Sequence, residues 1–154
     1  MYGVEKWIRQ GLPLQLSEEA LAKHRRKRSA LEIALECENR ALALLLLCNG
    51  YDPNLESDSP LNIGLVHHAG RGNARGVQLC LWAWADPHAE APSLRYSGMV
   101  DEDDSENEDD RFIGWSAVYE ACLHGHVDIL KRLGPDPARD DFDDLYGAAE
   151  IGGW

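Results

Sequence analysis

The stretch SALEIALECENRALALLLLCNGYDPN, residues 29–54, contains the pattern that decides the fold. Ser29 belongs to the residue types that favour a helix N-cap, and the apolar residues after it share one helical face. The polar residues ECEN end this first helix, and a second apolar helix is expected over 40–47. Gly50 then supplies the left-handed residue that often follows a helix, and DPN makes a turn. The sequence predicts a unit of helix, tight turn, helix and glycine-terminated loop.

This unit recurs along the chain. SPLNIG at 59–64 opens a second copy, which ends in VQLCLWAWADPHA at 77–89. GWSAVYEACLHGHVDILKRLGPDP at 114–137 is a third copy, and DDLYGAAEIGG at 143–153 is the first half of a fourth. VEKWIRQGLPL at 4–14 has the character of a second helix and its glycine ending. The recurrence indicates a solenoid of stacked helical repeats.

These segments resemble the ankyrin repeat family, whose unit of about 33 residues opens with T-P-L-H-x-A. SPLNIG and SALEIA keep the cap, the Leu and the small residue of that opening. EACLHGHVDIL is similar to the family's A-A-x-x-G-H stretch through Ala121, Gly125 and His126. NGYDPN, AWADPHA and GPDP are similar to its G-A-D-x-N turn. The resemblance covers nearly the whole chain and implies an all-α, ankyrin-type helical repeat solenoid that binds other proteins.

The chain departs from the regular family pattern in several places. The repeat openings are spaced by 30, 57 and 27 residues, and they fall at Ser29, Ser59, Ser116 and Asp143. About four of the extra residues in the second repeat are expected in the helix–helix turn HHAGRGN at 67–73, and about 20 between His88 and Ser116. His88 stands where the family has Asn, and Trp84 stands where it has the turn glycine.

We expect a single domain over residues 1–154. Its parts are an N-terminal partial repeat with a basic loop (4–28), a repeat (29–58), a repeat with a long acidic insertion (59–115), a repeat (116–142) and a C-terminal partial repeat (143–154). End repeats must cover the exposed apolar faces, so we expect Trp7 and Ile8 at one end, and Ile151 and Trp154 at the other, to be capping residues.

The predicted core takes apolar residues from every repeat. It comprises Leu31, Ala34, Leu42, Leu45, Leu46, Leu61, Leu79, Cys80, Val118, Ala121, Ile129, Leu130 and Leu133. Trp82 and Trp84 fit either the core or a contact surface, and the sequence does not decide between the two.

Composition restricts the partners. The 154-residue chain is 44% hydrophobic, which is typical of a globular protein, and its formal net charge is −12. A strongly negative protein is a poor ligand for nucleic acid or anionic membranes, so a basic protein surface is the expected partner. The longest apolar run, at 41–47, is far below the roughly 20 residues that span a bilayer. No secretory signal core precedes it, and the four cysteines form no C-x-x-C pair, so a reducing, cytoplasmic location is expected.

The densest charge is DEDDSENEDD at 101–110, with eight carboxylates in ten residues. We place it in an enlarged loop between the second and third repeats, where it is either a solvated, solubilising loop or a docking surface. DPARDDFDD at 136–144 and LESD at 55–58 would extend it into a negative ridge. Calcium binding is disfavoured because the glycine and glutamate of an EF-hand loop are missing. The basic KHRRKR at 23–28 is better explained as a solvated loop than as a nucleic-acid patch.

Catalysis is not expected. The chain has no glycine-rich phosphate loop and no G-x-S-x-G motif. A zinc cluster of His67, His68 and His124 is geometrically conceivable, but no pair has zinc-site spacing. We therefore predict a protein without enzymatic activity, metal or cofactor.

The predicted function is protein binding, by a chain that is a monomer when free. A small acidic ankyrin protein is similar to the immunity proteins or antitoxins that neutralise bacterial toxins, so a stoichiometric inhibitor of a toxin, nuclease or other basic effector is the first hypothesis. An adaptor joining cellular proteins is the second, and a metal-dependent enzyme or sensor the third. The candidate contact residues are Asp101, Glu102, Asp103, Asp104, Glu106, Glu108, Asp109 and Asp110 in the acidic segment, Glu36, Cys37, Glu120, Leu123 and His124 on the first helices, and Asp140 and Asp141 in a later loop.

Overall fold

The secondary structure of the protein is helical. A computed structural model describes residues 2–11, 29–53, 59–92 and 114–154, and within these ranges it contains helices and a single isolated β-bridge but no strand. The helices are α1 (Tyr2–Arg9), α3 (Ala30–Glu36), α4 (Arg40–Cys48), α5 (Pro60–Gly70), α6 (Ala74–Trp82), α7 (Ala117–Leu123), α8 (Val127–Leu133) and α9 (Phe142–Gly152). The all-α class predicted from the sequence is confirmed.

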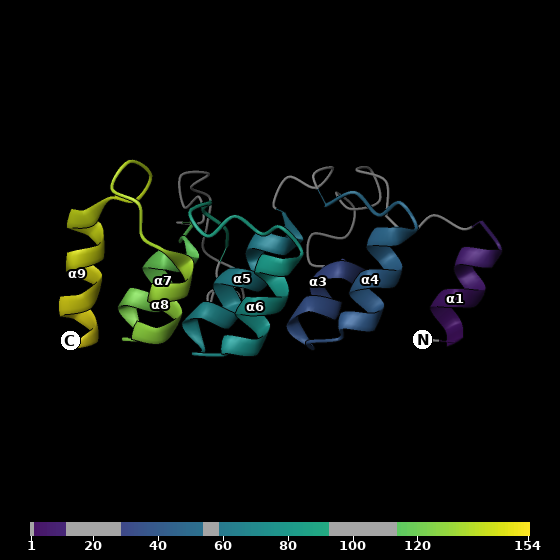
Figure 1. The fold of residues 1–154 in the computed structure, drawn as a ribbon, viewed down its shortest axis with the longest axis horizontal. Helices are drawn as coiled ribbons and strands as arrows, with labels where there is room; N and C mark the ends of the chain where they lie inside the picture. Colours follow the sequence, from purple (N-terminus) through teal and green to yellow (C-terminus); the bar gives the residue numbers. More distant parts are fainter. Residues whose placement is uncertain (1, 12–28, 54–58, 93–113) are drawn as a thin grey trace, which may run out of the picture.

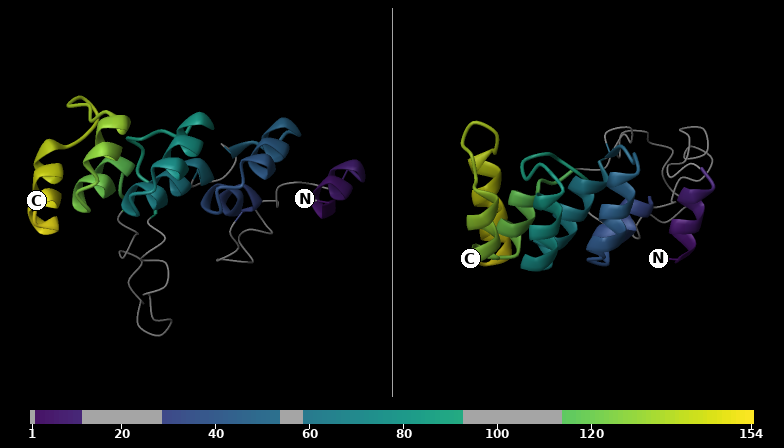
Figure 2. Two further views of the ribbon diagram at one scale, coloured as in Figure 1. Left: turned by 60° about the horizontal axis from the view of Figure 1, so that its bottom comes forward. Right: turned by 45° about the vertical axis from the view of Figure 1, so that its right-hand side comes forward.

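Successive helices form pairs that stack in a row (Figure 1). The pairs are α3 with α4, α5 with α6, and α7 with α8, and α9 continues the row without a second helix of its own. One layer consists of α3, α5, α7 and α9, each packed against the next, and α6 contacts both α3 and α8. Figure 2 shows the same row from two other directions, with α1 at one end and α9 at the other.

Helix starts follow the local sequence. The hydroxyls of Ser29 and Ser116 accept the backbone N–H of the residue three positions later, at 3.1 Å in both cases. Ser59 is also an N-cap but makes no side-chain cap bond, and Pro60 occupies the first turn instead. The opening predicted at Asp143 is wrong: the N-cap of α9 is Asp141, whose carboxylate accepts the N–H groups of the two residues that follow Phe142.

The extra residues of the second repeat lengthen a helix rather than a turn. We expected them in the turn at 67–73, but α5 continues to Gly70 and has 11 residues, whereas α3 and α7 have seven each. The sequence at 67–70 is His-His-Ala-Gly, and a glycine at such a place usually suggests that the helix ends there. Here the C-cap is Arg71, and the left-handed residue is Gly72, with φ 71°.

Two histidines, one buried and one half-buried, join neighbouring helix pairs. The Nε2–H of His68 donates to the carbonyl of Leu35 at 2.8 Å, so α5 is tied to α3. Its Nδ1 lies 3.2 Å from Nδ2 of Asn73, which can donate to it. His126 makes a similar link, because its Nε2 lies 3.3 Å from the carbonyl oxygen of Gly70. A buried polar group needs such partners, and each of these bonds also fixes the register of one pair on the next.

The core runs along the row between the two helix layers. Ten of the predicted core residues are buried: Leu31, Ala34, Leu46, Leu61, Leu79, Cys80, Val118, Ala121, Ile129 and Leu133. Leu42 and Leu130 are partly buried and pack against that core, and Leu45 is also half-buried. Trp82 and Trp84 are exposed, so the core alternative for these two tryptophans is wrong.

The predicted capping residues at the C-terminal end cover less of the apolar helix surface than expected. Ile151 and Trp154 remain 77% and 70% exposed. The Trp154 ring lies against Gly125, and its indole N–H donates to the carbonyl of Leu123 at 3.4 Å, so it covers only the turn after α7. Ile8 at the other end is half-buried, and the side chain of Trp7 lies outside the described residues.

The cysteines should divide into fast and slow groups toward a thiol reagent. Cys37 and Cys48 are exposed, whereas Cys80 is buried and burial raises its pKa to about 12. Burial also raises the pKa of Cys122, whose thiol donates to the carbonyl of Leu145 at 3.1 Å. Because the thiolate is the reactive form, two thiols per chain should label rapidly at pH 8 and two slowly. Rapid native labelling of all four would contradict this arrangement, and labelling in urea gives the full count.

Candidate protein-interaction surface

The carboxyl ends of the first helices bring together several of the predicted contact residues. Glu36 and Cys37 end α3, and Leu123 and His124 end α7. Nε2 of His67, on α5 between them, lies 3.9 Å from Oε1 of Glu36. These five residues lie at the carboxyl ends of α3, α5 and α7, next to the helix–helix turns, and we call them the turn row.

Glu120, which the sequence predicts as a contact residue, is buried. Its side chain is 3% exposed, with Oε2 lying 3.4 Å from Nε2 of His124. The carboxylate occupies space that a side chain at position 70 would need, since a Cβ added to Gly70 would lie 2.6 Å from Oε2. The structure therefore removes Glu120 from the predicted contact surface and places it between α5 and α7.

The loops at the opposite ends of the helices are bonded to each other. Nδ1 of His88, in the loop after α6, lies 2.9 Å from Oδ2 of Asp140, in the loop after α8. Beside this pair, Arg139 donates to Asp86 at 2.6 Å. The Arg139 hydrogen bond is the main cause that lowers the pKa of the Asp86 carboxyl. Two side-chain contacts to carboxylates, the His88–Asp140 contact and the Arg139–Asp86 ion pair, thus hold successive loops together, the first buried and the second exposed.

Asp140 and Asp141 have different surroundings. The Asp140 carboxylate is only 3% exposed and also accepts the backbone N–H of Asp136 at 2.7 Å, so the structure excludes it as a surface contact. Asp141 is exposed and caps α9. Exposed carboxylates next to it are those of Asp143 and Asp144. This acidic loop edge, residues 136–144 with exposed Glu90, is the described part of the ridge that the sequence predicts.

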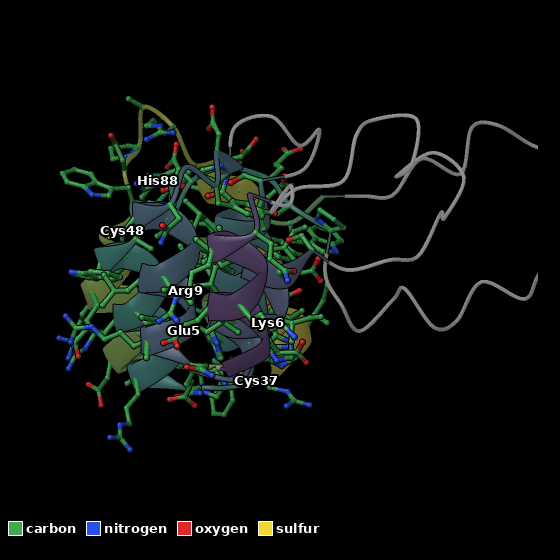
Figure 3. The ribbon with its side chains drawn as sticks, turned by 90° about the vertical axis from the view of Figure 1, so that its right-hand side faces the viewer. Glu5, Lys6, Arg9, Cys37, Cys48 and His88 are labelled. Carbon is green, nitrogen blue, oxygen red and sulfur yellow. The ribbon has the colours of Figure 1, made fainter. Side chains whose placement is uncertain are left out.

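The turn row and the loop edge lie at opposite ends of the helices. Figure 3 looks along the row from the α1 end, with Cys37 at the lower edge and His88 near the upper edge. A partner contacting both would therefore have to reach along the first helices from loops to turns.

Two residues that border the acidic insertion, one on each side of it, lie next to each other. Ala91 and Trp115 form an antiparallel bridge with two backbone hydrogen bonds of 3.1 Å. The Trp115 ring also stacks on Tyr119 of α7, with ring centroids 4.2 Å apart. The eight carboxylates predicted at 101–110 lie outside the described residues, as do 23–28 and 55–58.

Two tryptophans that the sequence left undecided are surface residues. Trp84 is 90% exposed and has φ 72°, in the left-handed region where glycine is normally found. Trp82 is 41% exposed, and the guanidinium of Arg40 lies 4.8 Å from its ring centroid. The signal that could have placed Trp84 outside was its position, equivalent to Gly50 of the preceding loop, which has φ 90°.

Replacing Trp84 with glycine should stabilise the protein by about 1 kcal/mol, since a non-glycine residue in the left-handed region costs roughly 1–2 kcal/mol. Little packing is lost because the side chain is exposed. Urea unfolding checks the change, and Trp84→Ala is the control, because alanine has the same backbone cost and should bring no gain. Equal stabilisation by both substitutions would show that the backbone is not the cause.

The described residues contain neither a candidate metal site nor a candidate membrane-spanning helix. There, no three His, Cys, Asp or Glu side chains are placed so that they could hold a metal ion. Nor does that part of the chain include a helix with the length and apolar character needed to cross a membrane. No family model matches the chain, and no curated protein matches it.

Proposed function

We propose that the helix pairs form an ankyrin-type solenoid. Three features support this proposal. The first helices α3 and α7 start at a bonded serine cap, and each second helix begins within four residues of the end of the first. Left-handed residues stand after the second helices at Gly50, Trp84 and Gly134, as the loops of that family require.

We further propose that the chain is a stoichiometric inhibitor, of the immunity-protein or antitoxin kind, that binds a toxin or other basic effector in the cytoplasm. The observation that carries the proposal is the acidic loop edge, held in place by the buried His88–Asp140 contact at 2.9 Å. Charges that are fixed before binding lose little freedom when a partner docks. With a net charge of −12, the chain would attract a basic partner and steer its approach.

In this proposal the two parts of the surface have separate roles. The loop edge and the acidic segment 101–110 speed the encounter, because exposed rim charges act mainly on the association rate. The turn row, with Leu123 as its apolar member, governs how long the complex lasts. If the effector is a nuclease, the carboxylates imitate the phosphates of its substrate. An adaptor that joins two cellular proteins is the alternative, and it would use the same surface without blocking an active site.

The test measures association with the product of a neighbouring toxin-like gene. The variant has Asp101, Asp103, Asp104 and Glu106 changed to Asn or Gln. It should associate about 10-fold more slowly at low salt, and the difference should shrink above about 0.5 M salt. The control variant makes the same change of net charge elsewhere, at Glu5, Glu18, Glu38 and Asp128, and should bind almost normally.

Unchanged association of the loop variant at low salt would reject the docking role of the acidic segment and leave it as a solubilising loop. Normal binding without inhibition of the effector would favour the adaptor instead. The turn row is tested separately by Leu123→Ser, which should shorten the lifetime of the complex and leave its association rate unchanged.

A further inference from the structure

The two layers of helices carry opposite charges. The layer of α3, α5, α7 and α9 contains six carboxylates and neither Lys nor Arg. The other layer, α4, α6 and α8, contains four Lys or Arg side chains and one carboxylate, that of Asp128. These three helices follow one another along the row (Figure 1). The second helices therefore give a basic surface to a chain whose net charge is −12.

The exposed side chains of this layer share one side of each helix. Residues three, four or seven positions apart lie on the same side of a helix, and the exposed residues have these spacings. They are Arg40, Leu44 and Cys48 on α4, Arg75, Gln78 and Trp82 on α6, and Val127, Asp128, Lys131 and Arg132 on α8. We call this set the second-helix face. The Arg40 guanidinium, 4.8 Å from the Trp82 ring centroid, connects α4 to α6, and α6 also contacts α8.

Helix stability accounts for only half of these cations. Lys131 and Arg132 stand in the last turn of α8, where the helix dipole favours positive charge. Arg40 and Arg75 stand in the first turns of α4 and α6, where the dipole disfavours it. An anionic ligand near Arg40 and Arg75 would offset this cost.

Two tryptophans stand at the loop end of α6. Trp82 belongs to the second-helix face, and Trp84 follows two residues later with φ 72°. Both side chains are exposed. A strained backbone conformation of this kind is often found at ligand-binding sites, and Trp and Arg are enriched among binding hot spots.

We infer that the second-helix face binds an acidic segment of a second partner protein. The carboxylates of that segment pair with Arg40, Arg75 and Lys131, since the arginine guanidinium matches a carboxylate in two parallel hydrogen bonds. Its apolar side chains contact Trp82 and Trp84. This inference goes beyond the proposed function, in which a basic partner uses the loop edge and the turn row.

The charge of the whole chain distinguishes the possible occupants. A nucleic acid brings a phosphate with every nucleotide, so much of its charge would extend past the face toward a protein of net charge −12. A second copy would bring another net charge of −12. A short acidic segment brings only a few carboxylates and adds apolar groups for the tryptophans, so it is the favoured occupant.

The experiment uses the full chain and a synthetic peptide of glutamate and leucine, roughly 14 residues or about four helical turns long. A salt concentration of about 0.15 M screens repulsion between charges more than about 8 Å apart and leaves direct ion pairs. Backbone amide and indole N–H spectra should show the largest shifts at Trp82, Trp84 and the exposed residues of α4.

The charge variant Arg40→Gln/Arg75→Gln should weaken peptide binding about 5-fold or more, because two ion pairs are lost. Its control is Lys6→Gln/Arg9→Gln, which makes the same change of net charge at exposed residues of α1 and should leave binding unchanged.

The aromatic variant Trp84→Ala should weaken peptide binding about 10-fold or more. Tyr146→Ala, which removes an exposed aromatic side chain from α9, should leave it unchanged. Circular dichroism checks that the variants remain folded, since every substituted side chain is exposed.

Four results would overturn the inference. The first is a set of shifts confined to residues outside the second-helix face and Trp84, and the second is equal peptide affinity of the charge variant and its control. Tighter binding of a single-stranded oligonucleotide at the same residues would assign the face to nucleic acid. Self-association of the unmodified chain that the charge variant abolishes would assign it to a second copy. All four leave the slower effector association of the acidic-segment variant untouched, so the two proposals can fail separately.

Discussion

Gly76→Ala should destabilise the protein by about 3 kcal/mol or more. A Cβ at this position would overlap the ring of His68, which is 2% exposed. The ring cannot move away without loss, because its Nε2–H donates to the Leu35 carbonyl at 2.8 Å. Alanine normally improves a helix by up to about 1 kcal/mol over glycine, so the loss must exceed that gain. The overlap therefore turns a substitution that usually stabilises a helix into a destabilising one.

Urea unfolding of Gly76→Ala measures the loss, and Gly147→Ala is its matched control. Both glycines are helical, but a Cβ at Gly147 would meet nothing within 4 Å, so alanine there should stabilise the protein slightly. A His68→Ala background should remove most of the penalty at Gly76, since the ring is then absent. A neutral effect of Gly76→Ala alone would mean that His68 does not occupy the space between α5 and α6.

His88→Ala is expected to cost about 2–4 kcal/mol of unfolding free energy, because it leaves a buried carboxylate without its side-chain hydrogen-bond partner. Asp140 is 3% exposed and would retain only the backbone N–H of Asp136, at 2.7 Å. His88→Asn, which restores a donor, should recover part of the loss.

The neighbouring contact supplies the comparison for this prediction. Arg139 and Asp86 are 49% and 39% exposed, and an ion pair this open to solvent contributes little to stability. Arg139→Met should therefore be nearly neutral in the same unfolding experiment. If both substitutions have the same small effect, His88 and Asp140 do not hold the two loops together.

Local chemistry explains which parts of the fold could be predicted. Ser29 and Ser116 were recognised as helix starts because a serine hydroxyl satisfies a free backbone N–H, and that bond depends on neighbours in the sequence. Gly50 was recognised as a left-handed residue because glycine often follows the end of a helix, which is also a local pattern. The length of α5 could not be predicted in this way. Gly70 suggests a turn, but in the folded chain it provides room for Glu120 of the next helix pair.

The candidate site was harder to predict because exposure depends on contacts between repeats. Glu120 and Asp140 are charged, so the sequence favours the surface for both. Their partners, His124 and His88, turn them inward. Trp84 was left undecided, since a large aromatic residue fits either a core or a contact surface, and its left-handed backbone and 90% exposed side chain decide for the surface.

The Ala91–Trp115 bridge has an evolutionary consequence. Its two 3.1 Å hydrogen bonds hold residues 91 and 115 side by side before α7 begins, so the two ends of the segment between them stay close together whatever its length. Doubling the length of such a closed segment costs only about 0.6 kcal/mol of chain entropy. Selection can therefore lengthen or shorten residues 93–113 at small entropic cost, and under the proposed function one scaffold could meet a changing partner without altering its helix pairs.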